Sequence, residues 1–169
     1  MINDKDIKIT DKHIFFCGSW LSNWYKSTIE LEDIFCNRFK FDSSGHFFMW
    51  RKAMEFKDTE IANKILTIKN PIEVKKLCKQ IHNFNDKQWN KVKYDIMFTA
   101  NIHKYNQNEE LLQKLCSDKF QDKTFVEASY DKIWGIGMSI NDIGVDDESN
   151  WKGQNLFGKC ITEVRNTFV

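Results

Sequence analysis

The chain has 169 residues, 41% hydrophobic and 14% aromatic, so we expect one domain with a substantial core. Its 25 basic and 24 acidic residues leave a net charge of +1, which excludes the broad basic field of proteins that bind duplex nucleic acid. No apolar run approaches the roughly 18–20 residues of a membrane span, and the N-terminus lacks the apolar core of a signal peptide.

The five cysteines are scattered and never form a Cys-x-x-Cys pair. Without a secretory signal, this pattern predicts reduced thiols and a cytoplasmic location. The four histidines lack the spacing of metal ligands, so we predict no metal site and no cofactor. Heavy use of Lys, Asn, Ile and Phe is typical of low-GC genomes, including viral ones.

Residues 1–12 are polar and are predicted to be a loosely ordered N-terminal extension to a domain that spans residues 13–169. Short apolar and aromatic runs at Phe15-Phe16 and within residues 29–41 predict strands. From Phe47 the apolar period becomes helical, and Lys52 lies on a stripe beside the apolar one.

Further helices are predicted from the apolar period and from capping residues. Asn70-Pro71 is a typical start, because Asn caps the helix and Pro loses nothing at its first position. Other helices are expected to begin near Asp58, after Asn85, near Leu111 and near Phe157. The expected fold class is α+β: a single compact, mainly helical domain with a few short strands.

The segment from Phe125 to Gly137 combines two carboxylates, Glu127 and Asp131, with the indole of Trp134 and two glycines. These are the components of a pocket for a flat, polar ligand. A strand, a turn and a core tryptophan is an equally available interpretation.

Five of the seven glycines lie in the last 35 residues. Gly153 and Gly158 bracket the start of the closing helix, whose free N–H groups could hold a phosphate. Tight packing of that helix would explain the pair equally well.

Several segments together resemble the NADAR or YbiA-like family. The similarity runs in family order from about Phe15 to the end of the chain. The matching segments are Leu21-Ser-Asn-Trp-Tyr25, His46-Phe-Phe-Met-Trp-Arg-Lys-Ala53, Trp89, Ile96-Met97, Lys104-Tyr-Asn-Gln-Asn108, Phe125–Gly137, and Trp151-x-Gly-x-Asn-x-x-Gly158 followed by Arg165. Members of this family are, or are inferred to be, N-glycosidases that act on ribosylated bases. The resemblance implies the same α+β fold, and a phosphoribosylated riboflavin-pathway intermediate or ADP-ribosylated guanine as substrate, whether free nucleotide or nucleic acid.

One position departs from the family pattern. Where the family places a glutamate just before the aromatic helix, this chain has Gly45. Because that glutamate is thought important for catalysis, a second hypothesis is a catalytically silent module that binds ADP-ribose or a related nucleotide. A protein-interaction domain without a small-molecule pocket is a third.

Cleavage of a ribose–base bond builds positive charge on the ribose, which a carboxylate stabilises. Asp131 is the candidate for that carboxylate, and Glu127 either orients its neighbours or serves as a cap or ion-pair partner. Lys52 offers a second route, in which a neutral amine attacks the opened ribose, although an ordinary solvated lysine is the plainer interpretation.

The remaining candidates are substrate-binding residues. Trp134 would stack on the base, with Gly135 beside it as a further substrate-binding position, and Trp89 would form the opposite wall or belong to the core. Phosphate contacts are expected from Lys104 and from the turn between Gly153 and Gly158. Asn23 and Asn155 suit ribose hydroxyls or base edges, or hold turns.

Overall fold

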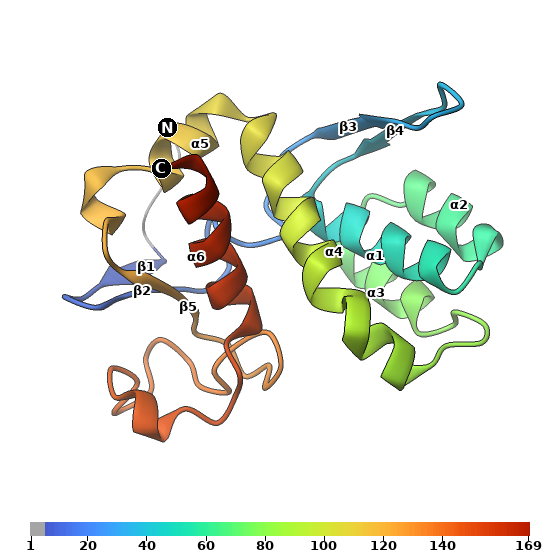
Figure 1. Cartoon of the computed structure of the whole chain (residues 1–169). Helices are drawn as coiled ribbons and strands as arrows, with labels where there is room; N and C mark the ends of the chain where they lie inside the picture. Colours follow the sequence, from blue (N-terminus) through green and yellow to red (C-terminus); the bar gives the residue numbers. More distant parts are fainter. Residues whose placement is uncertain (1–5) are drawn as a thin grey trace. The chain divides into compact units, whose positions relative to one another are not determined.

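The computed structural model describes residues 6–169, which divide into two compact units (Figure 1). The sheet unit contains the described residues up to Tyr25 together with Glu109–Val169. The helical unit is the intervening segment Lys26–Asn108.

The sheet unit is built on three strands, β1 (Ile7–Ile9), β2 (His13–Phe16) and β5 (Thr124–Glu127), in the order β1-β2-β5. β1 is antiparallel to β2, whereas β2 and β5 run parallel, with Phe16 opposite Glu127. All four residues of β2 are buried, as expected for a central strand covered on both faces. Residues 7–9, within the segment expected to be an N-terminal extension, are thus part of the sheet.

Helices and short 3₁₀ turns complete this unit. α6 (Leu156–Phe168) packs against β5, and α5 (Glu109–Leu115) follows the return of the chain from the helical unit. The 3₁₀ turns η1 (Asp118–Phe120) and η2 (Glu148–Asn150) lie on either side of β5 in the sequence. A core cluster joins the sheet to the loops after β5; its buried members are Phe15, Val126, Ala128, Ile136, Met138 and Val145.

The helical unit begins with an antiparallel hairpin of β3 (Ile29–Glu32) and β4 (Arg38–Phe41). Four helices follow: α1 (Ser44–Glu55), α2 (Thr59–Thr67), α3 (Pro71–Cys78) and α4 (Asp86–Asn106). α1 packs against the other three. Its aromatic stripe, including Phe47 and Trp50, packs with Phe41 of the hairpin and Ala100 of α4.

The predicted helix starts are confirmed by their caps. The side chains of Asp58, Asn70 and Asn85 accept hydrogen bonds from the backbone N–H of Ile61, Ile72 and Gln88, respectively. Each cap satisfies an N–H group that the helix itself cannot bond. The mainly helical α+β class is likewise confirmed, and no helix within residues 6–169 is long and apolar enough to cross a bilayer.

Candidate functional site

Glu127 ends β5 and closes the loop that follows it. Its carbonyl accepts hydrogen bonds from the N–H of Ser129 (3.0 Å) and of Ile136 (3.0 Å). The half-buried carboxylate lies near Cys17, at the end of the neighbouring strand β2. Burial and, secondly, the charge of Glu127 raise the pKa of the Cys17 thiol, so this cysteine is a poor nucleophile.

Asp131 organises the turn that carries the indole. Its Oδ1 accepts hydrogen bonds from the N–H of Ile133 at 2.7 Å and of Trp134 at 2.8 Å. The residue is exposed, and no donor within residues 6–169 is bonded to its Oδ2. One carboxylate oxygen therefore holds the turn while the negative charge stays accessible.

Trp134 is half-buried and tied to α6 through its backbone, since its carbonyl accepts from the N–H of Phe157 at 2.9 Å. The next residue is Gly135, and only glycine fits there, because an added Cβ would lie 2.3 Å from Ser129 Oγ. That hydroxyl is buried and has no hydrogen-bond partner among the described residues. The turn is thus tightly packed at Gly135.

The start of α6 differs from the phosphate site that the glycines suggested. The N–H groups of Asn155, Leu156 and Phe157 donate to the carbonyls of Gly135, Ile133 and Trp134. Added Cβ atoms would lie 2.4 Å from the Gly135 carbonyl at Gly153 and 2.2 Å from the Phe125 carbonyl at Gly158. Close backbone packing accounts for both glycines, and these N–H groups are not free.

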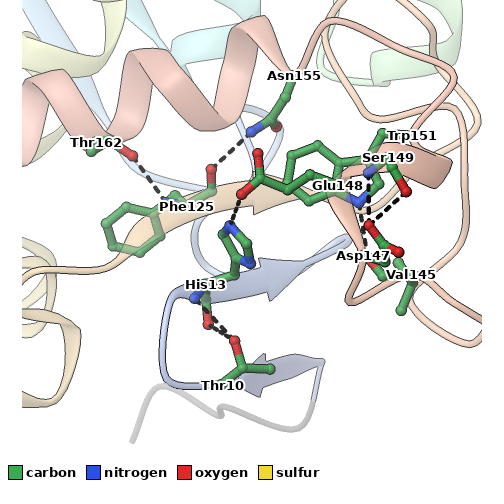
Figure 2. Close-up of polar contacts among 10 residues, drawn as sticks. All are labelled: Thr10, His13, Phe125, Val145, Asp147, Glu148, Ser149, Trp151, Asn155 and Thr162. Carbon is green, nitrogen blue, oxygen red and sulfur yellow. Dashed lines mark hydrogen bonds and ion pairs between the residues drawn. The ribbon is translucent and has the colours of Figure 1, made fainter.

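Asn155 joins α6 to the outer edge of β5 (Figure 2). Its Oδ1 accepts from the N–H of Glu127 at 3.0 Å, and its Nδ2 donates to the carbonyl of Phe125 at 3.1 Å. Thr162 Oγ1 accepts from the N–H of Phe125 at 2.9 Å. Because these side chains bond the backbone of an edge strand, Asn155 has a structural function whatever else it contacts.

The long loop between Met138 and Trp151 is anchored to the sheet through His13, which sequence analysis did not select. His13 Nε2 lies 3.0 Å from Glu148 Oε1, and its ring packs 5.3 Å from that of Trp151 (Figure 2). Trp151 Nε1 donates to the carbonyl of Val145 at 2.8 Å. A lone histidine in a short strand carries no sequence signal for such a contact 135 residues away.

Asn23 belongs to the same unit, in the half-buried segment that leaves β2. Seven of the other predicted site residues also lie in the sheet unit, joined by the loop and backbone contacts described above: Glu127, Asp131, Trp134, Gly135, Gly153, Asn155 and Gly158.

Lys52 and Trp89 come together in the helical unit. Lys52 Nζ lies 5.3 Å from the centre of the Trp89 ring and 4.3 Å from that of Phe84, which sequence analysis missed. Burial lowers the pKa of Lys52, in the direction that a neutral amine nucleophile requires. Phe84 lies in the loop 79–85, where neither periodicity nor a motif distinguishes it.

Lys104 also lies in the helical unit, on α4, and its side chain is fully buried. Burial lowers the pKa of Lys104 to about 7. The Nζ atom lies 5.1 Å from the centre of the Tyr105 ring. Lys104 therefore differs from a typical phosphate ligand, which is charged and faces solvent.

Gly45 is buried in the first turn of α1, which contains no acidic residue. The neighbouring His46 is buried too, with Nδ1 2.8 Å from Oγ of the cap residue Ser43. Burial lowers the pKa of His46. Among residues 6–169, no three His, Cys, Asp or Glu side chains gather as a metal site would require.

Comparison with known proteins gives a consistent relationship. Residues 15–169 match the family described as the NADAR domain. The chain is 32% identical to N-glycosidase R617 of Acanthamoeba polyphaga mimivirus, over 92% of this chain and 96% of that protein. It is 34% identical to protein irg-1 of Caenorhabditis elegans, over 86% of this chain and 67% of that protein.

A solved structure shares the fold. The NMR structure of E. coli YbiA superposes with a TM-score of 0.72 at 22% identity, covering 97% of this chain and 89% of that one.

Proposed function

The chain belongs to the NADAR domain family, and from that premise we propose that it is an N-glycosidase that hydrolyses the bond between ribose and a base. The substrate class is a phosphoribosyl or ADP-ribosyl adduct, such as a riboflavin-pathway intermediate or ADP-ribosylated guanine. A relative that matches nearly its full length and is named an N-glycosidase supports this reaction type.

The observation that carries the proposal is the turn from Asp131 to Trp134. It places an accessible carboxylate and a half-buried indole on one rigid backbone segment, held by two hydrogen bonds to Oδ1. As the base departs, positive charge develops on the ribose, and the carboxylate of Asp131 stabilises it. The indole stacks on the base, a contact of about 1–3 kcal/mol.

Lys52 supplies a second route within the same proposal. A neutral lysine amine attacks the C1 carbon of an opened ribose, the base leaves with a proton, and water then hydrolyses the Schiff base to regenerate the amine. The lowered pKa of Lys52 supports this role, because more of the amine is neutral at physiological pH.

Glu127, which ends β5, is proposed to orient the loop that bears Asp131, and Asn23 to contact ribose or base. Phosphate binding by Lys104, or by the turn between Gly153 and Gly158, would require these groups to change exposure or hydrogen-bond partners. We therefore do not assign the phosphate contacts to them.

Asp131→Asn is expected to lower the rate of base release at least about tenfold, because it removes the charge and leaves the Oδ1 acceptor for the turn. Free base would be quantified by chromatography from ADP-ribosylated guanosine and from a phosphoribosylated riboflavin precursor. The matched control is Asp146→Asn, an exposed carboxylate of the same unit paired with Lys8. Wild-type turnover in Asp131→Asn would remove Asp131 from the mechanism.

A catalytically silent ADP-ribose-binding module is the second candidate, favoured by the absence of an acidic residue in the first turn of α1. In that case the wild type binds ADP-ribose in calorimetry but releases no base, and Gly45→Glu starts hydrolysis. Gly45→Gln is the control, because it adds the same volume at a buried position without the charge. Robust turnover by the wild type would reject this candidate.

A further inference from the structure

Two aromatic rings enclose the amine of Lys52. The centre of the Phe84 ring lies 4.3 Å from Nζ, and that of the Trp89 ring lies 5.3 Å from it. Both distances are within the roughly 6 Å at which a ring face attracts a cation. The three residues come from α1, from the loop 79–85 and from the first turn of α4, all inside the helical unit.

The two rings are themselves held by phenylalanines at either end of α1. Phe48 packs against Trp89 with ring centres 5.2 Å apart, and Phe56 packs edge-on against Phe84 at 5.0 Å. Each of the two rings around the Lys52 amine therefore has its own aromatic support inside the helical unit.

We propose that Phe84 and Trp89 are positioning residues that cage the Lys52 amine and set the fraction of it that is neutral. The inference rests on the proposed function, in which Lys52 is a nucleophile. It assigns to Trp89 the task of holding the amine, in place of stacking on the substrate base.

Two opposing effects act on the caged amine. The ring faces attract the ammonium form, whereas their bulk excludes water and favours the neutral form. Burial prevails and lowers the pKa of Lys52, against the weaker opposing effects of Cys78 and Asp86. Burial raises the pKa of Cys78 to about 11, so this thiol is neutral at physiological pH and Asp86 is the charged group that opposes the shift.

The two walls differ in how easily they can move. Trp89 is buried, with 8% of its surface exposed, whereas Phe84 is 39% exposed. Phe84 also follows Asn83, whose φ of +55° marks a tight turn in the loop. Phe84 is therefore the wall that substitution can change with the least disturbance of the core.

Substitutions of Phe84 separate the two effects. Phe84→Leu keeps an apolar cover but removes the ring, so the pKa of Lys52 is expected to fall below that of the wild type. Phe84→Ala admits water, so the pKa is expected to rise. The loss of one cation–π contact corresponds to about a two- to fivefold change in the ratio of neutral to charged amine.

The pKa would be measured by NMR titration of the protein after reductive ¹³C-methylation of its lysines, with the Lys52 signal assigned by its loss in Lys52→Arg. Phe35→Leu is the matched control, because Phe35 is an exposed phenylalanine of the same unit in the hairpin turn. The cage is supported if the pKa of Lys52 is lowest in Phe84→Leu, intermediate in the wild type and highest in Phe84→Ala. The signal of the exposed Lys64 should not change. Equal values for wild type and Phe84→Leu would overturn it, and this pair decides even if Phe84→Ala fails to fold.

A second measurement distinguishes the cage from the proposed function. Borohydride reduction with ribose 5-phosphate would trap a Schiff base on Lys52, detected by mass spectrometry of the peptide. If the pKa order holds but no adduct forms and no base is released, the cage stands and the nucleophile role fails. If an adduct forms at the same rate in all Phe84 variants and the pKa does not move, the reaction stands and the cage fails.

Discussion

The stability of Lys104→Met relative to wild type is expected to depend strongly on pH, and to be more favourable to the variant at pH 6 than at pH 10. The side chain of Lys104 is fully buried, and burial lowers its pKa from 10.5 to about 7. An ammonium that leaves water in this way costs stability, and methionine has a similar length without the charge.

The pH dependence follows from proton binding in the two states. Between pH 7 and pH 10.5 the unfolded chain keeps the proton on Lys104 and the folded chain releases it, so the wild type gains stability as the pH rises. Below pH 7 Lys104 is protonated in both states, and its burial then lowers the free energy of unfolding by about 4–5 kcal/mol. By pH 10 this loss of stability falls to about 1 kcal/mol.

Urea unfolding of wild type and Lys104→Met at pH 6, 8 and 10 measures this difference directly, since groups that titrate in both proteins cancel. Lys91→Met is the control, because Lys91 is exposed on the same helix and should change stability by about 0.5 kcal/mol or less. A variant less stable than wild type by a constant amount at every pH would show that Lys104 is charged and well compensated in the fold.

Asn155→Leu is expected to destabilise the sheet unit by about 3–8 kcal/mol. The substitution leaves the N–H of Glu127 and the carbonyl of Phe125 without their side-chain partner, at about 1–3 kcal/mol for each buried group. Asn155 also has a φ of +53°, which asparagine tolerates and leucine adopts only with added strain.

Asn155→Asp tests the same geometry through pH. One carboxylate oxygen can still accept from Glu127, but the other replaces the amide and faces the Phe125 carbonyl. Because repulsion between oxygens disfavours the charged form, the folded-state pKa of the new carboxyl should be raised. The loss of stability should be largest near pH 7 and shrink as the pH falls and the carboxyl gains a proton.

Thermal unfolding by circular dichroism compares both variants with Asn141→Leu, a control at an exposed asparagine in the loop after Met138. Thr162→Val should cost less than Asn155→Leu. It removes the acceptor of the Phe125 N–H and the donor to the Gly158 carbonyl, and the second of these bonds lies within α6. If Asn155→Leu unfolds at the wild-type temperature, the edge of β5 does not depend on this amide.

Local hydrogen bonding explains which parts of the fold were predictable from sequence. Asn70-Pro71 and Asn85 announce helix starts because a cap bonds N–H groups two or three residues away. The pairing of β2 with β5 was not predictable, since the residues that meet are 111 positions apart, as in His13 and Thr124. The strand at residues 7–9 was not predicted for a related reason: a strand of only three residues is recognised by its pairing with β2, not by its own sequence.

In the candidate site, too, some features could be predicted from local sequence and others only from the tertiary structure. The Asp131–Trp134 turn was identified from residue types and their order, because a carboxylate next to an indole and glycines is a local pattern. Lys52 was identified from the segment His46–Ala53, which resembles the family. The pattern of glycines around residue 155 suggested a phosphate site, yet the N–H groups there bond a loop some twenty residues earlier. A sequence shows which N–H groups a helix start leaves open, but not which distant carbonyls occupy them.

By itself, the sequence determined the family, the mainly helical α+β class, the helix starts and the segment that carries the candidate carboxylates, since these depend on residue type and short spacing. Tertiary structure alone decided that Lys104 is buried, that aromatic rings enclose Lys52 and that backbone contacts explain Gly158. Burial and close approach arise from segments that meet only after folding, and they set a side chain's pKa and its freedom to bind a ligand.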